Sequence, residues 1–499
     1  MLLQSASSLL HEHYISVISA IILLVLVSQV YYQLFVNPLG KYPGPKLAAT
    51  SRLPQLYHTL KGDVVEWVNG LHTTHGDVVR VAPDELSYAT GEAWKGIYGH
   101  ASAGKQVTEK DLRFYGSSFN GAPDIIRGNG SDHARFRRNF SHAFSDRALR
   151  EQQPLICKYA DTLIDKLHRT IEEDPEAKIN MVSMLNLTTF DIIGDLTFGD
   201  SLNLLAGTGN LAWVSAVFIS MKTNTVSRLA RYFPWTTPIV RMLIPNELKQ
   251  QSIAHYKASQ ESVDKRIDAN HTMYKPDIWG IVMNQKESLR LSRAEMHANS
   301  QIFMVAGTET TATALSGLLY RLLMTPEKMS IIVEEVRGAF DKGSDIEIRA
   351  LEHMPYLNAC IEEGLRIYPP VPVGLPRIAP KDGLLVCGEH IPGKTVLSVH
   401  HWATYRNAQN FRLPNHFIPE RWISDEFATD NKAAFQPFSF GPRNCLGKNL
   451  AYHEMRLILA KLLYSFELSL LPDSIGWEKQ KTFLLWEKKD LMVQLKARK

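Results

Sequence analysis

The ten residues Phe438-Ser-Phe-Gly-Pro-Arg-Asn-Cys-Leu-Gly447 place one cysteine, Cys445, in a run of turn-forming and cationic residues. Gly441-Pro442 is a turn signal, and an apolar helical pattern follows over residues 449–466. Arg443 and the positive N-terminal end of that helix would both favour a thiolate over a thiol at Cys445. Because Gly447 has no Cβ, a flat ligand could approach the backbone there.

A lone cysteine, taken by itself, is most often a small buried hydrophobic residue. The frame around this one has the spacing F-x-x-G-x-R-x-C-x-G, which resembles the haem-thiolate loop of the cytochrome P450 family. A thiolate presented in this way is a soft axial ligand for haem iron. The resemblance implies haem b (iron protoporphyrin IX) as the cofactor, Cys445 as the axial ligand, and Phe438, Arg443 and Gly447 at the haem. It also implies a mainly α fold with a small β region.

The composition is that of a large globular protein. The chain has 499 residues, 45% of them apolar, so it can bury a large core. No linker rich in Pro, Gly, Ser or charge divides the chain after residue 50, which favours one catalytic unit. The net charge of +4 is too small to indicate nucleic-acid binding. The four cysteines have neither zinc nor disulfide-framework spacing, which is typical of a reducing compartment.

The N-terminus predicts a membrane anchor. Tyr14–Val36 contains no charge, and a helix of that length, rising ~1.5 Å per residue, crosses the ~30 Å hydrocarbon core. A cleaved signal peptide is the alternative, but it needs a basic first segment and a clear cleavage site. Residues 1–13 lack Lys and Arg, whereas Lys41, Lys46 and Arg52 follow the span. The positive-inside rule therefore places the body of the protein in the cytosol.

Two Pro-rich segments after the span, Asn37–Gly40 and Tyr42–Pro45, predict a stiff, non-helical hinge. Microsomal members of the resembled family also have such a hinge, which implies a single-pass protein of the endoplasmic reticulum membrane. We therefore expect four parts: a lumenal tail (1–13), a transmembrane anchor (14–36), a hinge (37–50) and a catalytic domain (51–499).

Residues 131–144 predict an amphipathic helix in which His133 and Arg137, four residues apart, share one face. The simplest interpretation is that both residues belong to a basic helix face exposed to solvent. In the resembled family, a W-x-x-x-R pair in this helix contacts a haem propionate, and His stands here in place of Trp. The resemblance implies that Arg137, with His133 beside it, binds a propionate; a neutral imidazole can still donate one hydrogen bond.

The clearest helix begins at a capping box of Ser292 and Glu295 and can continue to Met324. It is apolar nearly all round, which predicts burial, but its middle reads Ala306-Gly-Thr-Glu-Thr-Thr311. The polar residues in this buried helix are either a tolerated defect or a notch for dioxygen and water. A Thr hydroxyl can bond the carbonyl four residues back and so loosen the turn. The segment is similar to the family's A-G-x-D/E-T-T motif, which implies that Thr310 and Glu309 guide protons.

Glu363 and Arg366 lie on one helix face, a spacing that usually marks a surface ion pair of little value. In the resembled family this E-x-x-R pair joins the arginine of a later P-E-R segment, here Pro419–Trp422. The resemblance implies a structural brace of Glu363, Arg366 and Arg421, with two arginines on one carboxylate. It also implies that Arg377 binds a propionate.

The other elements are predicted from periodicity and turn signals. We expect an irregular loop over 92–126, which in the resembled family helps to cap the substrate pocket. The long blocks 155–200 and 211–268 predict helices. The second block is rich in aromatic residues, which are either core or, as the resemblance implies, part of a mobile lid. Two hairpins are expected, one of Asp77–Ala82 with Glu85–Ala89 and one of Gly383–Val386 with Thr395–Val399.

Together the motifs predict a haem-thiolate monooxygenase, most similar to fungal secondary-metabolism members such as the trichothecene (isotrichodermin) hydroxylases. The resemblance implies hydroxylation or epoxidation of a lipophilic terpenoid or polyketide with dioxygen and NADPH-derived electrons. The electrons would come through a membrane-bound NADPH–cytochrome P450 reductase, with cytochrome b5 as an optional donor. Arg138, Arg443 and Lys448 either face an acidic reductase surface or are ordinary solvated charges.

Two other classes of function remain open. A haem-thiolate isomerase or dehydratase would rearrange a peroxide without a reductase, and the intact Glu309-Thr310 pair argues against it. A non-enzymatic haem binder or sensor would need neither a proton relay nor an apolar pocket. The residues expected to line that pocket indicate only that the substrate is lipophilic: Phe303, Val305, Ala306, Val371, Val373, Leu375 and Phe483.

Overall fold

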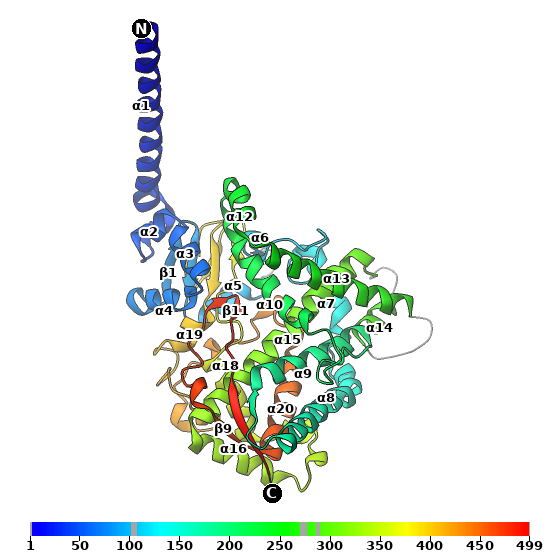
Figure 1. Ribbon diagram of the computed structural model, residues 1–499. Coiled ribbons are helices and arrows are strands. Elements are labelled where there is room, and N and C mark those ends of the chain that lie inside the picture. Colours follow the sequence, from blue (N-terminus) through cyan, green and yellow to red (C-terminus); the bar gives the residue numbers. More distant parts are fainter. Residues whose placement is uncertain (1, 101–106, 270–276, 286–289, 499) are drawn as a thin grey trace.

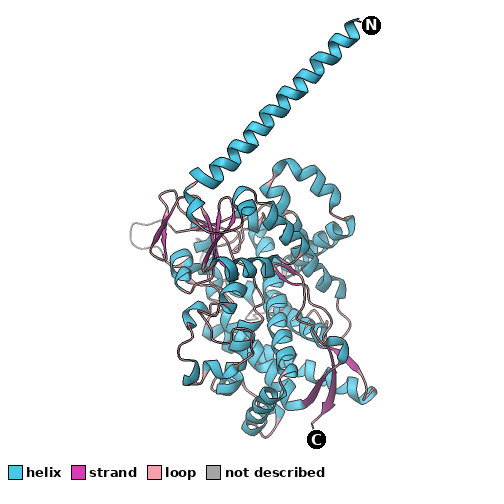
Figure 2. Ribbon diagram, turned by 90° about the vertical axis from the view of Figure 1, so that its left-hand side faces the viewer, coloured by secondary structure: helices cyan, strands magenta, loops and turns pink. Residues whose placement is uncertain are grey.

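The computed structural model describes residues 2–100, 107–269, 277–285 and 290–498. Long helices surround a central helix, α15 (Arg293–Met324), and short strands gather near the base of the N-terminal helix and at the C-terminus (Figures 1 and 2). The predicted mainly α fold with small β regions is confirmed. The predicted capping box is also present, because the Ser292 side chain accepts from Glu295 N–H and the Glu295 carboxylate accepts from Ser292 N–H.

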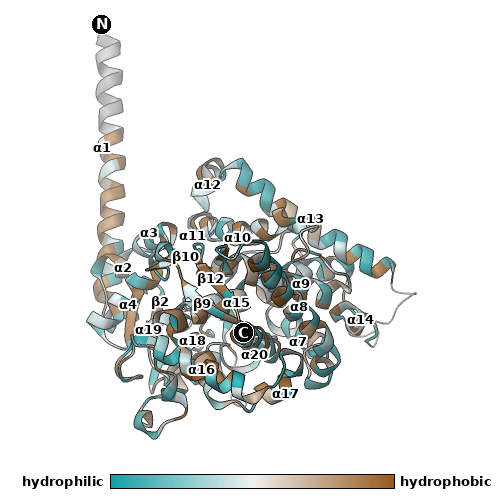
Figure 3. Ribbon diagram, turned by 60° about the horizontal axis from the view of Figure 1, so that its bottom comes forward, coloured by the Kyte–Doolittle hydropathy of each residue, from teal (hydrophilic) through white to brown (hydrophobic). Residues whose placement is uncertain are grey.

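The N-terminal helix α1 (Leu2–Tyr31) projects away from the rest of the protein (Figure 1) and continues through a π turn at Tyr32–Val36. The side chains of residues 14–32 are exposed and mainly apolar, as Figure 3 shows for the half of α1 nearer the body. The segment Tyr14–Val36 is therefore a candidate membrane anchor. Helix α15 is also long and apolar, but 72% of its most apolar window is buried, so it belongs to the core.

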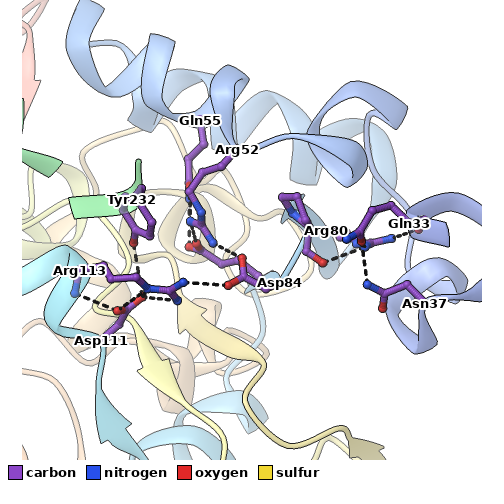
Figure 4. Close-up of polar contacts among 11 residues, drawn as sticks. Gln33, Asn37, Arg52, Gln55, Arg80, Asp84, Asp111, Arg113 and Tyr232 are labelled. Atoms are coloured by element: carbon purple, nitrogen blue, oxygen red, sulfur yellow. Dashed lines mark hydrogen bonds and ion pairs between the residues drawn. The ribbon is translucent and has the colours of Figure 1, made fainter. Parts of the chain in front are cut away.

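The base of the anchor is fastened to the nearest strand. Arg80 of β1 (Val78–Ala82) donates to the carbonyl and side-chain oxygens of Gln33, at 2.8 and 2.7 Å (Figure 4). The prediction of a non-helical hinge was wrong in part, because Pro38–Lys41 is a 3-10 turn and Lys46–Thr50 is helix α2. The Asn37 side chain caps the turn by accepting from Leu39 N–H, and Pro38 fits in a first turn, where no donor is needed.

The largest sheet has the strand order β1-β2-β8-β5-β3. Its first two strands, β1 and β2 (Glu85–Tyr88), form the first predicted hairpin. The second predicted hairpin was wrong in one strand: β6 (Leu384–Val386) pairs with β7 (Glu389–Ile391). The fully buried β8 (Val396–Val399) instead lies between β2 and β5 (Arg377–Ile378), because a strand without an exposed face belongs inside a sheet.

The remaining strands are short. The three-stranded sheet β4-β12-β9 carries the C-terminus, and β10 pairs with β11. Their bounds are β3 Glu109–Lys110, β4 Lys178–Asn180, β9 Phe466–Leu470, β10 Thr482–Phe483, β11 Leu485–Trp486 and β12 Met492–Ala497.

The predicted helical blocks are confirmed, but residues 92–126 are less irregular than expected. Helix α5 (Glu92–Tyr98) forms there because its apolar residues are buried against the large sheet. Helix α6 (Leu112–Tyr115) begins where the Asp111 side chain accepts from Arg113 N–H. The other α-helices are α3 Leu53–Lys61, α4 Val64–His75, α7 Gly130–Ser141, α8 Asp146–Glu173, α9 Met181–Phe198, α10 Leu211–Val226, α11 Arg228–Tyr232, α12 Thr237–Leu243, α13 Asn246–Asp268, α14 Ile278–Met283, α16 Pro326–Ala339, α17 Ile348–Leu351, α18 Pro355–Ile367, α19 His401–Arg406 and α20 Lys448–Ser465. Further 3-10 turns lie at Pro234–Thr236, Gly343–Asp345, Pro419–Trp422, Asp425–Phe427, Lys432–Ala434, Gly441–Arg443 and Pro472–Ser474.

Candidate functional site

The loop that carries Cys445 is held by its own backbone. The Cys445 N–H donates to Phe438 O at 2.8 Å, which closes the loop before α20 begins. Gly441 has φ +74°, and a Cβ there would lie 2.0 Å from Tyr98 O, so only glycine fits. At the start of the loop, the Tyr405 hydroxyl accepts from Gln436 N–H at 3.0 Å. The backbone therefore sets the position of the sulfur.

Cys445 lies deep within the protein and yet keeps an exposed side chain. A side chain with both properties lines an internal space. Burial raises the pKa of the Cys445 thiol, while the Gly447 N–H, Arg137 and Lys448 lower it. The expectation that local features favour the thiolate was therefore incomplete, because it left out burial, which is the larger effect here. Metal coordination deprotonates a thiol outright and overrides this balance.

The wall opposite the loop belongs to α15. Ala306 is exposed and Thr310 is partly exposed, although Met304 and Thr308 beside them are buried. Aromatic contacts connect this helix to the cysteine loop. A Cβ at Gly447 would meet only Phe144 Cε1, at 3.8 Å, and the Phe144 ring lies 6.2 Å from Phe303 of α15. The open side of Gly447 therefore leaves room for a flat group.

The predicted notch in α15 has two separate causes. The Thr310 hydroxyl donates to Ala306 O at 2.5 Å, as expected from the spacing. Gly307 has a packing role: a Cβ there would lie 2.5 Å from Ile193 Cγ1 of α9, so glycine lets the two helices approach closely. The small residue is thus explained by helix packing, and the threonine remains the polar group at the internal space.

Glu309 is not a free carboxylate at the internal space, because it is paired with a lysine from a distant part of the chain. Its carboxylate is buried and pairs at 2.5 Å with Lys488 Nζ, which also donates to Thr313 Oγ1 at 2.8 Å. Lys488 lies in the C-terminal segment between β11 and β12. No local signal in the sequence points to this contact, because 179 positions separate the two residues. In this structure Glu309 is a fixed member of an ion pair.

A cluster of basic residues lies at one side of the cysteine. The electrostatic neighbours of His133 are all cations, and together with burial they lower the pKa of His133 to about 3. Burial also lowers the pKa of Lys110 well below its usual value. The cluster consists of Lys110, His133, Arg137, Arg377 and Arg443. Lys110 was not predicted as a site residue, because it lies in a strand of two residues with no motif around it.

Every hydrogen bond that these cations make in the described ranges ends on a neutral acceptor. Arg137 donates to the backbone and side-chain oxygens of Asn444, both at 2.6 Å, and Arg377 donates to the Tyr115 hydroxyl at 2.9 Å. Lys110 donates to Ile125 O at 3.0 Å. Arg443 donates to Gly128 O at 3.1 Å and Asn129 Oδ1 at 3.0 Å. The cluster is therefore short of negative charge.

These observations fit a haem. A deep but exposed thiol supplies a soft iron ligand, the open face of Gly447 leaves room for a flat ring, and uncompensated cations suit two propionate carboxylates. Phe438 contributes its carbonyl, which accepts from Cys445 N–H, and its ring packs 5.2 Å from that of Tyr452. Of the predicted site residues, His133, Arg137, Arg377 and Arg443 lie in one cluster beside the cysteine loop, with Lys110 and Tyr115 added.

The predicted brace is present and completely buried. Arg366 donates two hydrogen bonds to Glu363, from Nη2 to Oε1 at 2.7 Å and from Nε to Oε2 at 2.8 Å. Arg421 is a weaker member than expected, because its Nε lies 3.5 Å from Glu363 Oε2 and its Nη1 pairs with Asp430 instead. The Trp422 indole N–H donates to Glu363 Oε2 at 3.1 Å and takes the place that a second forked arginine would occupy.

A cavity of about 860 Å³ lies beside the cysteine loop. Its lining includes Phe438, Asn444 and Lys448, together with Glu352, which follows α17, and Glu362 of α18. Cys445, Thr310 and Arg377 do not line it, so it is a surface groove behind the loop and not the internal space where chemistry would occur.

Glu454 of α20 is a buried carboxyl whose proton should affect stability. Burial raises its pKa from the usual 4.5 to about 8, although the Thr311 hydroxyl opposes the shift. Between these pH values the folded protein keeps a proton that the unfolded chain has lost, so stability falls as pH rises through this window. We expect Glu454→Gln to exceed the wild type in stability at pH 8, by up to about 5 kcal/mol, with no difference at pH 4.

Thermal denaturation across this pH range measures that effect. Glu467→Gln is the matched control, because Glu467 is exposed and pairs only with Arg337 at the surface. The assigned pKa would be wrong if the difference in unfolding midpoint between the wild type and Glu454→Gln were the same at pH 4 and at pH 8.

Comparison with known proteins gives matches over nearly the whole chain. The profile of the family "Cytochrome P450" matches residues 43–495. "Cytochrome P450 monooxygenase efuB" of Hormonema carpetanum is 47% identical over 470 residues, which cover 93% of each chain. "Cytochrome P450 monooxygenase FUM2" of Gibberella moniliformis is 41% identical over 94% of this chain and 100% of its own. "Cytochrome P450 monooxygenase astJ" of Aspergillus oryzae is 40% identical over 94% of each.

Proposed function

The chain belongs to the cytochrome P450 family and is a monooxygenase that uses a haem-thiolate cofactor, dioxygen and a redox partner; from this premise we propose its substrate and the role of each site residue. The substrate is a lipophilic secondary metabolite, a terpenoid or a polyketide, which the enzyme hydroxylates or epoxidises. The fungal sources of the similar monooxygenases support this class. The observation that carries the site assignment is the deep but exposed thiol of Cys445 opposite an opened stretch of α15.

We assign haem b as the cofactor, with Cys445 as the iron ligand and Gly447 against the ring. Arg137 and Arg377 would pair with the propionates as cations, while Lys110 and the neutral imidazole of His133 would donate hydrogen bonds to them. Arg443 is already bonded to backbone and amide oxygens, so it positions the loop as well. When bound, the haem supplies the activation of dioxygen.

The protein's own contribution to the reaction is the delivery of protons. Thr310 presents a hydroxyl at the internal space while its proton is held on Ala306 O. Glu309 can pass protons to this region only when its carboxylate leaves Lys488, so the ion pair limits how often the relay is open. The isomerase alternative would need no such relay, and the similar proteins, which are named as monooxygenases, disfavour it.

Replacing Thr310 with Ala should separate electron use from product formation. We expect NADPH consumption to continue while hydrogen peroxide rises and product falls by tenfold or more, on the order expected for a lost proton donor. Measuring NADPH, peroxide and product together tests this. Thr308→Ala is the matched control, because Thr308 makes the same bond to Met304 O at 2.7 Å but is buried on another side of the helix. Full coupling in Thr310→Ala, or turnover without NADPH, would overturn the assignment.

We further propose that α1 anchors the protein in the endoplasmic reticulum membrane, with residues 1–13 in the lumen and the catalytic domain in the cytosol. The redox partner is then the membrane-bound NADPH–cytochrome P450 reductase, with cytochrome b5 as an optional donor. The groove of about 860 Å³ behind the cysteine loop is the surface where electrons would enter. The exposed Lys448 and Arg138 near it suit an acidic partner.

The substrate is identified most directly in a fungal strain that lacks the gene. Metabolites are compared between that strain, the strain restored with the wild-type gene, and a strain restored with Cys445→Ala. A lipophilic compound that accumulates in the first and third strains, and gains one oxygen atom in the second, supports the proposal. A substrate that is small and polar would contradict it.

A further inference from the structure

Arg228 is a buried arginine without a counter-charge. It is the first residue of α11, and its side chain is 6% exposed. In the described part of the chain, its Nε and Nη2 atoms have no hydrogen-bond partner, and no carboxylate pairs with it. The face of the Phe114 ring lies 3.8 Å from its Cζ, which stabilises the cation but satisfies none of its donors.

The acidic groups nearby are already paired (Figure 4). Glu85 accepts from Arg52 with one oxygen and from Gln55 Nε2, at 3.0 Å, with the other. Asp84 pairs with Arg52 and with Arg113, the latter at 3.2 Å. These contacts use up the local carboxylates and leave the guanidinium of Arg228 uncompensated. Burial lowers the pKa of Arg228 to about 10, so it stays charged at neutral pH.

Arg228 lines a cavity of about 60 Å³ that has both apolar and polar walls. The polar wall residues include Glu85, whose two oxygens are already bonded to Arg52 and Gln55. The cavity volume exceeds the roughly 10–15 Å³ that one water molecule needs, so a small polar group fits. The cavity adjoins the proposed haem site, because its walls include Pro376, next to Arg377, and Phe114, next to Tyr115, which bonds Arg377. Its apolar lining comes from Leu56, Val64, Val68, Val81, Phe114, Val373 and Pro376.

A buried charge without a partner destabilises the folded chain unless something else compensates it. Here the unused donors adjoin a cavity beside the site of reaction, which is where a substrate group would lie. We propose that Arg228 binds a carboxylate of the substrate, so that the enzyme acts on a lipophilic carboxylic acid held by its acid group at the far end from the oxidised carbon. This inference rests on the proposed function and narrows its substrate class.

Acid and ester pairs test the proposal directly. The full-length, haem-loaded protein in detergent is titrated with dodecanoic, hexadecanoic and oleanolic acids and with their methyl esters, and binding is followed by the change in the haem absorption spectrum. We expect at least one acid to bind the wild type ~10-fold or more tightly than its ester, as for a charge-assisted bidentate contact. Arg228→Gln should lower that ratio to about 1, and Arg228→Lys should restore part of it.

Arg231→Gln is the matched control. Arg231 lies one turn further along α11, but its donors are bonded to the backbone carbonyls of Arg113, Phe114 and Asn224, and it does not line the cavity. Its loss should leave the acid-to-ester ratio unchanged. Thermal unfolding without ligand gives a second readout: Arg228→Met should have a midpoint equal to or above that of the wild type, because it removes an unpaired buried charge.

The proposal is overturned if no acid in the set binds the wild type more tightly than its ester, or if Arg228→Gln keeps the preference. A lower unfolding midpoint in Arg228→Met would also overturn it, because it would show that the arginine stabilises the fold. The reduced carbon monoxide spectrum, recorded for each variant, keeps this test separate from the proposed function. An intact spectrum with no acid preference rejects the acid site alone.

Discussion

Replacing Cys445 with Ala should abolish the reduced carbon monoxide band of a thiolate-bound haem and, with it, all NADPH-dependent oxygenation. The effect should be complete, because the other three cysteines lie elsewhere: Cys157 in α8, Cys360 buried in α18, and Cys387 between β6 and β7. The fold should survive, since the loop is closed by the backbone bond from Cys445 N–H to Phe438 O, which alanine keeps. Absorption spectroscopy of the purified variant measures the loss.

Cys157→Ala is the control for this substitution. Cys157 is half-buried in α8, where burial also raises its thiol pKa, but it packs against the core and faces no site. Its replacement should leave the spectrum and the activity unchanged. An unaltered carbon monoxide band in Cys445→Ala would remove the iron ligand from the proposed site, and circular dichroism of the same sample would show whether unfolding explains a lost band.

The parts of the site that could be predicted from the sequence are those set by short-range spacing. The turn before Cys445 is closed within ten residues by the bond from Cys445 N–H to Phe438 O, and Glu363 with Arg366 lies on one helix turn. The bond from Thr310 to Ala306 follows from helix geometry alone. For such contacts the residue types and their separation determine the geometry, so the pattern was sufficient.

The contacts that the sequence could not show join distant segments. Lys488 reaches Glu309 across 179 positions, and Lys110 enters the cation cluster from a strand of two residues. Arg228 gave no signal at all, because its significance is the absence of a partner, which depends on Arg52 already holding Glu85. Burial around Cys445 was missed for the same reason: it is a property of the folded chain.

Substituting Arg366 with Met should unfold the region behind the cysteine loop and release the haem. Arg366 and Glu363 are both 0% exposed, so removing the arginine leaves an uncompensated charge in the core. The substitution also removes the donor from three backbone carbonyls, those of Tyr405, Pro414 and His416, which accept from Arg366 at 2.9, 2.7 and 2.8 Å. We expect a loss of about 3–5 kcal/mol in the free energy of unfolding, the usual cost of breaking a buried pair.

The matched control is Arg412→Met, which breaks the exposed ion pair of Arg412 and Glu426. It should cost less than about 1 kcal/mol, because solvent screens such a pair. Thermal unfolding and the ratio of haem to protein after gel filtration distinguish the two variants. Since this buried network joins α18 to the Pro419–Trp422 turn and does not line the internal space, the loss in Arg366→Met should appear in haem retention before it appears in substrate choice. A haem-loaded Arg366→Met protein of wild-type stability would show that helix packing alone positions the cysteine loop.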